Sequence, residues 1–234
     1  MGESDMDQRE CTEEMKERLF SIPLFKDMPV NIKQTLLSKL DCRFYQFYKK
    51  EVVARQNTPC KWLYVLLEGR LKVEIIDALG NEILIEYIIA PRTFATPHLF
   101  SGDSTLPATF TALEEGILLM ASKESFFRLF SEEPGILRNF LRITGNCTQC
   151  TVKRLHMLSY KSVRGRIIAY LMEHRKSSAE AVRMVHNQQQ LAEYLGVTRP
   201  ALSKEINKMA KEGLIRLEGT VVHILALDIL KRSL

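Results

Sequence analysis

Two short helical patterns meet at a single glycine near the C-terminal end of the chain. Residues 188–215 read QQQLAEYLGVTRPALSKEINKMAKEGLI. Asn187 precedes them and can cap a first helix, which Gly196 can end. Thr198 can cap a second helix with Pro200 in its first turn, where the missing N–H costs little. This stretch therefore predicts two helices that pack across a tight turn.

The second of these helices has one apolar face and one polar face. Leu202, Ile206 and Met209 recur at i, i+4 and i+7, so we expect this face to be buried. In a helix–turn–helix, the second helix enters the major groove of DNA, where basic and amide side chains read the base edges. The candidate DNA contacts on the polar face are Arg199, Ser203, Lys204 and Asn207.

Three further features favour DNA binding over a helical hairpin with a solvated basic face. Gln188 and Gln189 begin the first helix, where backbone amides favour a phosphate. Residues 214–225 predict a hairpin with an EGT turn, which would form a wing. Residues 159–234 carry 13 Lys and Arg against 7 Asp and Glu, a net charge of +6, whereas the whole chain carries +5. A basic C-terminal third suits a polyanionic partner.

The N-terminal part of the chain has the periodicity of strands. Residues 43–121 are rich in β-branched and aromatic residues and are broken by turn residues, which favours a β-roll over a parallel sheet. We predict an α+β fold. It comprises a jelly-roll-like β-roll sensor with N-terminal helices over 1–133, a long dimerisation helix over 134–160 and a winged helix–turn–helix over 161–234.

The long helix is expected to begin at Pro134 and to carry two adjacent apolar stripes. One stripe could pack on the β-roll and the other on the same helix of a second copy. A helix buried within one subunit is the alternative. The candidate dimer contacts, at steps of four and three, are Ile136, Phe140, Ile143, Cys147 and Cys150.

Several classes of protein are disfavoured by composition and by missing motifs. No run approaches the ~20 apolar residues of a membrane span, and the acidic start MGESDMDQRECTEEMKERLF does not resemble a signal peptide, so we expect a cytoplasmic chain without a membrane partner. The five cysteines are scattered and odd in number, which disfavours a disulfide framework. We expect no enzyme, because the sequence has no Walker loop, GxSxG, HExxH or pair of zinc-spaced CxxC motifs.

From about Leu19 onward, the order of segments resembles the CRP/FNR superfamily of bacterial transcription regulators. LYVLLEGRLKVEIIDALGNEILIEYI is similar to its β-roll, and EEPGILRNFL resembles the start of its dimerisation helix. SVRGRIIAYL resembles the hinge and first helix of its DNA-binding domain. QLAEYLGVTRPALSKEINKMAKEGLI resembles its helix–turn–helix, and its VTRPALSKE core looks most like HcpR-type members, which respond to nitrosative stress.

This resemblance implies a homodimer that binds a palindromic operator in double-stranded DNA and has RNA polymerase as a further partner. It also implies that an effector bound in the β-roll reorients the reading helices. Arg199 and Lys204 match positions where the family often has basic readers. Pro200 stands where many members have a glutamate that accepts from cytosine, so the family's usual half-site is not expected here.

The residues that bind a cyclic nucleotide in this family are replaced in the stretch PRTFATPHLFSGDSTLPATFTAL. Ala95 and Thr96 stand in place of a glycine–glutamate pair, and Leu106 and Pro107 in place of an arginine–serine pair. Without the arginine, a buried cyclic phosphate has no evident partner, so cAMP is not expected as the ligand. An iron–sulfur cluster is not expected either, because Cys11 is the only cysteine near the N-terminus.

The sequence leaves three hypotheses for the effector. The first is haem that senses nitric oxide or carbon monoxide, with His98 or Cys147 as axial ligand and with Met120 or Met157 as further candidates. The second is a redox switch at Cys147 and Cys150. The third is an apolar small molecule in the vacated pocket. The candidate effector residues are Thr96, His98, Leu106 and Pro107.

Overall fold

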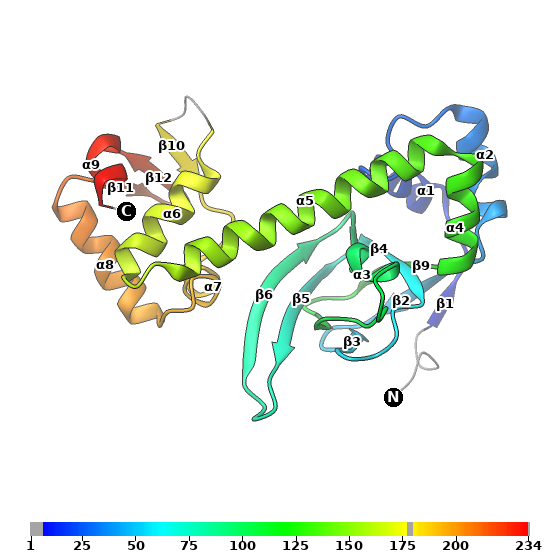
Figure 1. Ribbon diagram of the computed structural model, residues 1–234, viewed down its shortest axis with the longest axis horizontal. Coiled ribbons are helices and arrows are strands. Elements are labelled where there is room, and N and C mark those ends of the chain that lie inside the picture. Colours follow the sequence, from blue (N-terminus) through cyan, green and yellow to red (C-terminus); the bar gives the residue numbers. More distant parts are fainter. Residues whose placement is uncertain (1–6, 177–179, 234) are drawn as a thin grey trace. The chain divides into compact units, whose positions relative to one another are not determined.

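The computed structural model describes residues 7–176 and 180–233, and the chain forms two compact units over 1–148 and 149–234 (Figure 1). The division falls inside helix α5 (Pro134–Ser159). The predicted helix and its start at Pro134 are thus observed, but its two ends belong to different units. The reason is packing, since Ile136 lies in the core of unit 1 and Met157 in the core of unit 2.

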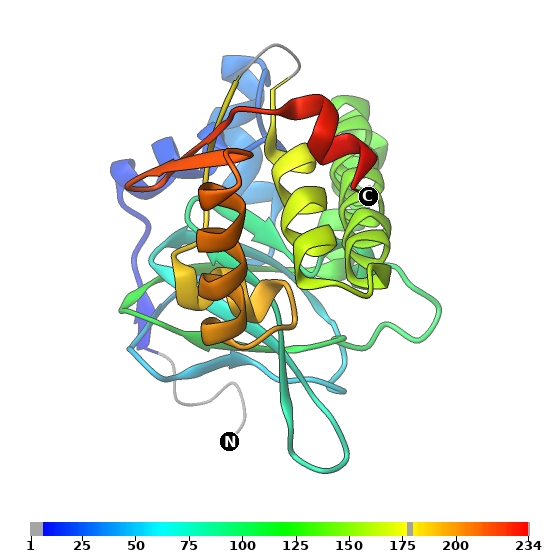
Figure 2. The same cartoon turned by 90° about the vertical axis from the view of Figure 1, so that its left-hand side faces the viewer.

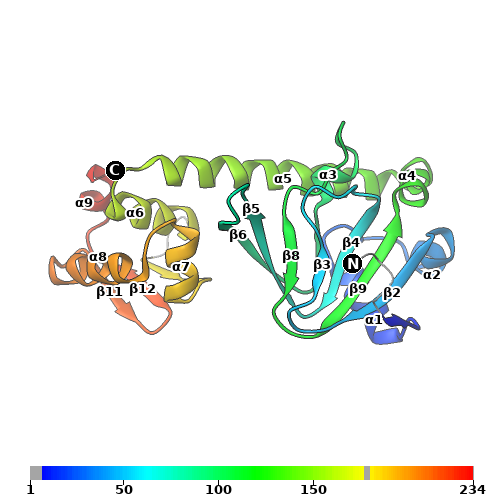
Figure 3. The same cartoon turned by 90° about the horizontal axis from the view of Figure 1, so that it is seen from below.

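Unit 1 is built from two antiparallel sheets. Five strands lie in the order β1-β2-β9-β4-β7, and four lie in the order β3-β8-β5-β6, which Figure 3 shows side by side. The first sheet contains β1 (Asp7–Arg9), β2 (Cys42–Phe47), β9 (Gly116–Ser122), β4 (Trp62–Glu68) and β7 (Arg92–Phe94). The second contains β3 (Val52–Ala54), β8 (Thr109–Ala112), β5 (Arg70–Ile76) and β6 (Glu82–Ile89).

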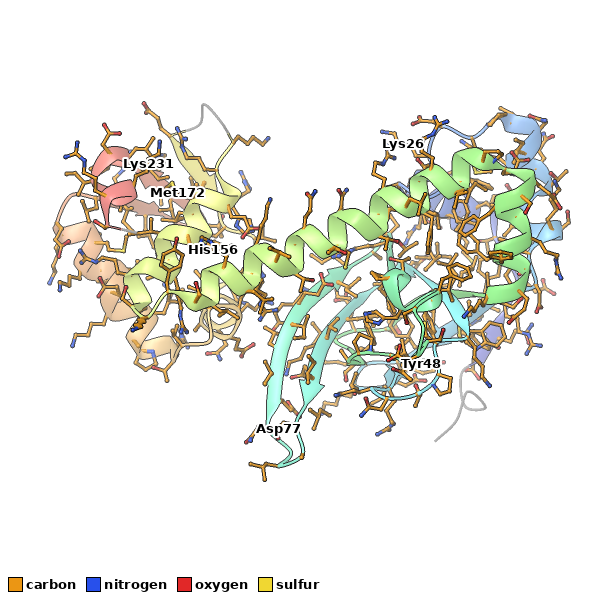
Figure 4. All side chains as sticks on the ribbon, in the orientation of Figure 1. Lys26, Tyr48, Asp77, His156, Met172 and Lys231 are labelled. Carbon is orange, nitrogen blue, oxygen red and sulfur yellow. The ribbon has the colours of Figure 1, made fainter. Side chains whose placement is uncertain are left out.

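The turns of the β-roll follow the turn residues of the sequence. Gly69 joins β4 to β5 at φ 90°, and a Cβ there would lie 2.8 Å from the Glu115 carbonyl oxygen, so only glycine fits. The β5–β6 hairpin projects from its sheet and turns at Asp77, whose carboxylate accepts hydrogen bonds from the Leu79 and Asn81 amides (Figure 4). The apolar inner faces of both sheets share one core.

Short helices complete unit 1. They are α1 (Glu13–Ser21), α2 (Val30–Lys39), α3 (Thr96–Leu99) and α4 (Lys123–Glu132). The Thr12 hydroxyl caps α1 and the Ser122 hydroxyl caps α4. Phe140 of α5 packs against Phe126 and Phe130 of α4, with ring centroids 5.7 and 5.2 Å apart. The first half of α5 is therefore part of the core of unit 1.

Unit 2 holds the end of α5 and a winged helical fold, which faces the viewer in Figure 2. Its elements are α6 (Val163–His174), β10 (Ala181–Arg183), α7 (Gln188–Tyr194), α8 (Arg199–Lys211), β11 (Ile215–Glu218), β12 (Val221–Ile224) and α9 (Leu227–Arg232). The three strands form a sheet in the order β10-β12-β11. The α+β fold class is confirmed. None of the helices within the described ranges has the length and hydropathy of a membrane span.

Candidate nucleic-acid interface

The predicted helix pair forms with the caps that the sequence suggested. The Asn187 side chain accepts from the Gln190 amide, and the Gln190 side chain accepts from the Asn187 amide, which makes a capping box at the start of α7. The Thr198 hydroxyl accepts from the Ala201 amide at the start of α8. Gly196 lies between the helices at φ 62°, where a side chain would be strained.

One arginine holds the turn between α7 and α8 in place. The Arg166 guanidinium on α6 donates from Nη1 to the carbonyl oxygens of Leu195 and Gly196 at 3.0 and 3.2 Å. Its Nε donates to the Tyr160 carbonyl oxygen at 2.9 Å. Because charged hydrogen bonds satisfy the carbonyls at the end of α7, the helix pair has a fixed geometry.

The four predicted readers lie on the outward side of α8. Leu202, Ile206 and Met209 are buried, as the periodicity predicted. On the other side, Arg199, Lys204 and Asn207 are exposed and Ser203 is half-buried. Neither Arg199 nor Lys204 takes part in an ion pair within the part of the chain that the structure describes. Their charges are therefore available to a ligand.

The two predicted glutamines at the start of α7 have different surroundings. Gln188 and Gln189 are both exposed. The Gln189 amide nitrogen donates to Glu193 Oε1 at 2.8 Å, so its side chain is held along α7. The capping box already occupies the amide of Gln190. A phosphate at the start of α7 would therefore bind the backbone amides of Gln188 and Gln189.

The wing is a tight hairpin, as predicted. β11 and β12 pair from Ile215↔Ile224 to Glu218↔Val221, and Gly219 turns between them at φ 60°. The exposed Arg216 lies on β11. The Thr220 carbonyl oxygen accepts from the Met184 amide at 2.8 Å, which fixes the tip against the segment after β10. A basic side chain is thus carried on a rigid hairpin beside α8.

Sequence reasoning missed an ion-pair cluster that joins α6 to α8. Arg164 Nε contacts Glu205 Oε1 at 2.5 Å, and its Nη1 contacts Glu212 Oε2 at 2.8 Å. Arg164 also lowers the pKa of Glu212, mainly through this hydrogen bond. The pattern of charges in the sequence held a weak signal, because Glu205 and Glu212 lie seven residues apart on the side of α8 opposite the readers.

A cluster of aromatic rings lies behind the helix pair in unit 2. Arg154 lies over the Tyr194 ring at 4.6 Å, and the Tyr194 ring stacks on His186 at 4.7 Å. The Tyr170 hydroxyl lies 3.1 Å from His186 Nδ1. Burial lowers the pKa of His186 to about 4, with smaller contributions from His174 and Arg154. His186 is therefore neutral near pH 7.

Acid is expected to destabilise unit 2 through His186. Its pKa is about 4 in the folded chain and near the ordinary 6.5 when unfolded. The unfolded state thus binds more protons between these values, and the free energy of unfolding falls as pH drops from 6.5 to 4. His186→Asn should flatten this part of the curve of unfolding midpoint against pH. His156→Asn, at an exposed site, is the control and should keep the wild-type slope. Equal slopes in wild type and His186→Asn would refute this prediction.

The predicted dimer stripe on α5 requires correction. Ile136 and Phe140 are buried in the core of unit 1, so these two side chains are not available to a second copy, whereas Ile143 is half-buried and packs against that core. Cys147 is half-buried and Cys150 is exposed. The exposed apolar residues of α5 belong to the neighbouring side of the helix and are Leu141, Val152 and Leu155, at 61%, 60% and 64% exposure.

The predicted effector residues lie in and near α3 in unit 1. Thr96 and Leu106 are buried, His98 is half-buried and Pro107 is exposed. Leu106 pairs with the loop of Asn57 and Thr58 through two backbone hydrogen bonds of 2.9 Å. Leu106, which we predicted to replace the family's arginine, is thus buried and held by its backbone.

The methionines named as further haem-ligand candidates lie in the hydrophobic cores of the two units. Met120 is buried in the core of unit 1 and Met157 in the core of unit 2, so both are packing residues. Burial lowers the pKa of His98, and Asp103 opposes this shift. Phe100, two residues after His98, packs against rings of α4 and α5 at 5.6–5.8 Å. No group of three or more His, Cys, Asp or Glu suited to a metal occurs among the described residues.

Comparisons with known proteins agree with this architecture. Residues 45–133 match the cyclic nucleotide-binding domain family, and residues 165–233 match the Crp-like helix–turn–helix domain family. The chain is similar to the transcriptional activator protein anr of Pseudomonas aeruginosa, with 24% identity over 76% of this chain and 74% of that protein. It is also similar to the CRP-like cAMP-activated global transcriptional regulator of Mycobacterium tuberculosis, with 25% identity over 76% of this chain and 82% of the relative.

Solved structures share the fold at low identity. A CooA mutant from Carboxydothermus hydrogenoformans superposes with a TM-score of 0.67 at 18% identity, covering 91% of this chain and 99% of that one. The Catabolite Activator Protein of Thermus thermophilus gives a TM-score of 0.52 at 20% identity, covering 90% and 97%. The two domain matches, their order and the similar regulators show that the chain belongs to the CRP/FNR family of transcription regulators.

Proposed function

We propose that this transcription regulator is an effector-gated homodimer that reads a palindromic operator with α8. The observation that carries the proposal is the exposure of Arg199, Lys204 and Asn207 on a capped helix whose other face is buried. Two copies would place two α8 helices in successive major grooves, about ten base pairs apart. RNA polymerase is the further partner that we propose.

The salt dependence of DNA binding tests this function. Residues 159–234 carry a net charge of +6, so binding should release counterions, and log K should fall steeply with log salt. Titration of labelled mixed-sequence DNA at several salt concentrations measures the slope, and selection from a random duplex library tests for a two-fold site. A flat slope, or selected sites without two-fold symmetry, would contradict the proposal.

Lys204→Ala is expected to weaken operator binding by ~1–3 kcal/mol and to relax the preference for one base pair. The reason is that the variant lacks the contact that Lys204 would make to guanine. Lys211→Ala is the matched control. It removes the same charge from the C-terminal end of α8, so it should weaken binding to all sequences alike. Competition binding against operators mutated one base pair at a time separates the two effects. If the Lys204→Ala variant keeps the base-pair preference of the wild type, Lys204 does not read a base.

The effector is proposed to differ from cAMP. Leu106 and Pro107 stand where a cationic partner for the cyclic phosphate would be needed, and Leu106 is buried in packed surroundings. Pro97, in the short helix α3, also lacks the amide proton that a phosphate could use. Isothermal titration with cAMP is the direct test, and binding at micromolar concentration would contradict this part of the proposal.

Three other effector hypotheses remain distinguishable by experiment. Nitric oxide sensing through haem rests on the resemblance of the helix–turn–helix to HcpR-type members and retains His98 or Cys147 as candidate ligand. A Soret band that shifts with nitric oxide, in protein purified with haem present, would support it. A redox switch at Cys147 and Cys150 predicts a disulfide-linked dimer on a non-reducing gel. An apolar ligand predicts an increase in the unfolding midpoint.

A further inference from the structure

Two cysteines lie at the end of the β1–β2 ladder. The pairs are Asp7↔Gln46, Gln8↔Tyr45 and Arg9↔Phe44. Cys11 lies two residues beyond the end of β1, and a continuation of this register would place it across from Cys42, the first residue of β2. Directly opposite residues of antiparallel strands have Cα atoms ~4.5–5.5 Å apart, which lies within the range that a disulfide spans.

The side chains along this register point to the same side of the ladder. The Arg9 guanidinium donates to Gln46 Oε1, and the Tyr48 hydroxyl lies 3.1 Å from Asp7 Oδ2. Opposite residues share a face, and residues two apart along a strand share it too. Cys11 and Cys42 therefore fall on one face of the ladder. Both sulfurs pack against the core of unit 1, and both are thiols in this structure.

The two sulfurs also influence each other electrostatically. Burial, with smaller contributions from Cys11 and Asp41, raises the pKa of Cys42 to about 11, and the contribution of Cys11 requires the two thiols to be near each other. Burial also raises the pKa of Cys11, but Lys16 acts in the opposite direction. We assign Cys11 as the attacking thiol, because Lys16 favours its thiolate, and Cys42 as the resolving thiol.

We propose that Cys11 and Cys42 form a reversible thiol–disulfide site whose oxidant is a peroxide. The Cys11 thiolate attacks one peroxide oxygen and breaks the O–O bond. The product is a sulfenic acid, and the other oxygen leaves as water after taking up a proton. Cys42 then attacks the Cys11 sulfur, forms the S–S bond and releases a second water. Two thiols and one hydrogen peroxide thus give one disulfide and two waters, and a dithiol reverses the oxidation.

The bridge would fix a segment that borders a cavity in unit 1. The cavity has a volume of about 600 Å³, and its wall includes the neighbours of Cys11 on both sides, Glu10 and Thr12. Gln46 and Glu115 lie on the wall as well. Thr12 also caps α1. Oxidation would tie the start of α1 to β2 and hold this wall in one position.

Peptide mapping of the full-length chain tests the proposal. The protein is treated with hydrogen peroxide, denatured, alkylated and digested without reductant. We expect a peptide that joins Cys11 to Cys42, the loss of two alkylatable thiols, and the return of both after dithiothreitol. Cys150→Ser removes an exposed thiol and should leave the linked peptide unchanged, whereas Cys11→Ser and Cys42→Ser should abolish it. The rate should rise from pH 6 to pH 9, because the thiolate fraction increases.

Two results would overturn the proposal. One is saturating oxidation of the wild-type chain without the linked peptide, with Cys11 unmodified or overoxidised to sulfinic acid. The other is a bridge only through Cys147 or Cys150 between two copies. The wild-type map decides between these outcomes even if a serine variant folds poorly. The unfolding midpoint of the oxidised wild type should exceed that of the reduced chain, because the bridge closes a loop in the unfolded state.

Discussion

Leu155→Arg is expected to leave each protomer folded and to lower operator affinity by about 10²–10⁴-fold. Leu155 is 64% exposed on α5, so an arginine there costs the isolated protomer little. We place the seam of the proposed dimer on the exposed apolar side of α5, where the two guanidinium groups would meet and lose water. A dimer binds both half-sites of the operator at once and therefore has a higher affinity than a monomer, which binds only one half-site.

Ile229→Arg is the matched control for this prediction. Ile229 is an apolar side chain of unit 2 with 55% exposure, but it lies on α9. It receives the same charge and should keep both the dimer and its affinity. Light scattering after size exclusion gives the mass of each variant, and fluorescence anisotropy gives its affinity for the operator. A dimeric Leu155→Arg variant with wild-type affinity would exclude this side of α5 as the seam.

Local signals in the sequence accounted for the helix–turn–helix. Asn187 and Thr198 cap their helices, Gly196 has positive φ, and the apolar spacing of α8 gives its buried face. Each of these features depends on residues within one or two turns of chain, so a linear pattern contains the required information. The positions of the candidate readers followed from the same pattern, because they are the polar residues of α8 that lie outside its buried apolar face.

The faces of α5 could not be assigned in the same way. Both stripes of α5 contain apolar residues. Their periodicity predicts that two faces of the helix are covered, but it does not predict which segment or copy covers each face. Phe140 is buried because Phe126 and Phe130 of α4 lie beside it in space. Leu155 is 64% exposed among the described residues. Such contacts depend on how distant segments fold together, and this information is not in the helix itself.

Pairs that are distant in sequence were missed for the same reason. Cys11 and Cys42 looked like scattered thiols, and only a continuation of the register of β1 on β2 would place them opposite each other. Arg164 and Glu205 are 41 residues apart, yet they form the closest ion pair of unit 2 among the described residues. Composition and periodicity contain no term for register or for helix packing, so these sites required the structure.

Arg164→Ala is expected to lower the free energy of unfolding of unit 2 by ~2–4 kcal/mol. The side chains of Arg164 and Glu205 are only 25% and 20% exposed, so this cluster is more protected from solvent than a surface pair. Removing the guanidinium leaves two carboxylates without their partner, and one of them is largely buried. Thermal and urea unfolding, followed by the Tyr fluorescence and by circular dichroism, measure the loss.

A double-mutant cycle separates lost attraction from a stranded charge. Arg164→Ala combined with Glu205→Gln should recover part of the stability, because no unpaired buried carboxylate remains. Glu218→Gln removes a carboxylate that is 73% exposed and pairs with His223, so it should cost far less. Glu205 lies on the side of α8 opposite the readers, where its ion pair with Arg164 fixes α8 against α6. Arg164→Ala should therefore also weaken DNA binding. A loss no larger than that of Glu218→Gln would show that the cluster does not position α8.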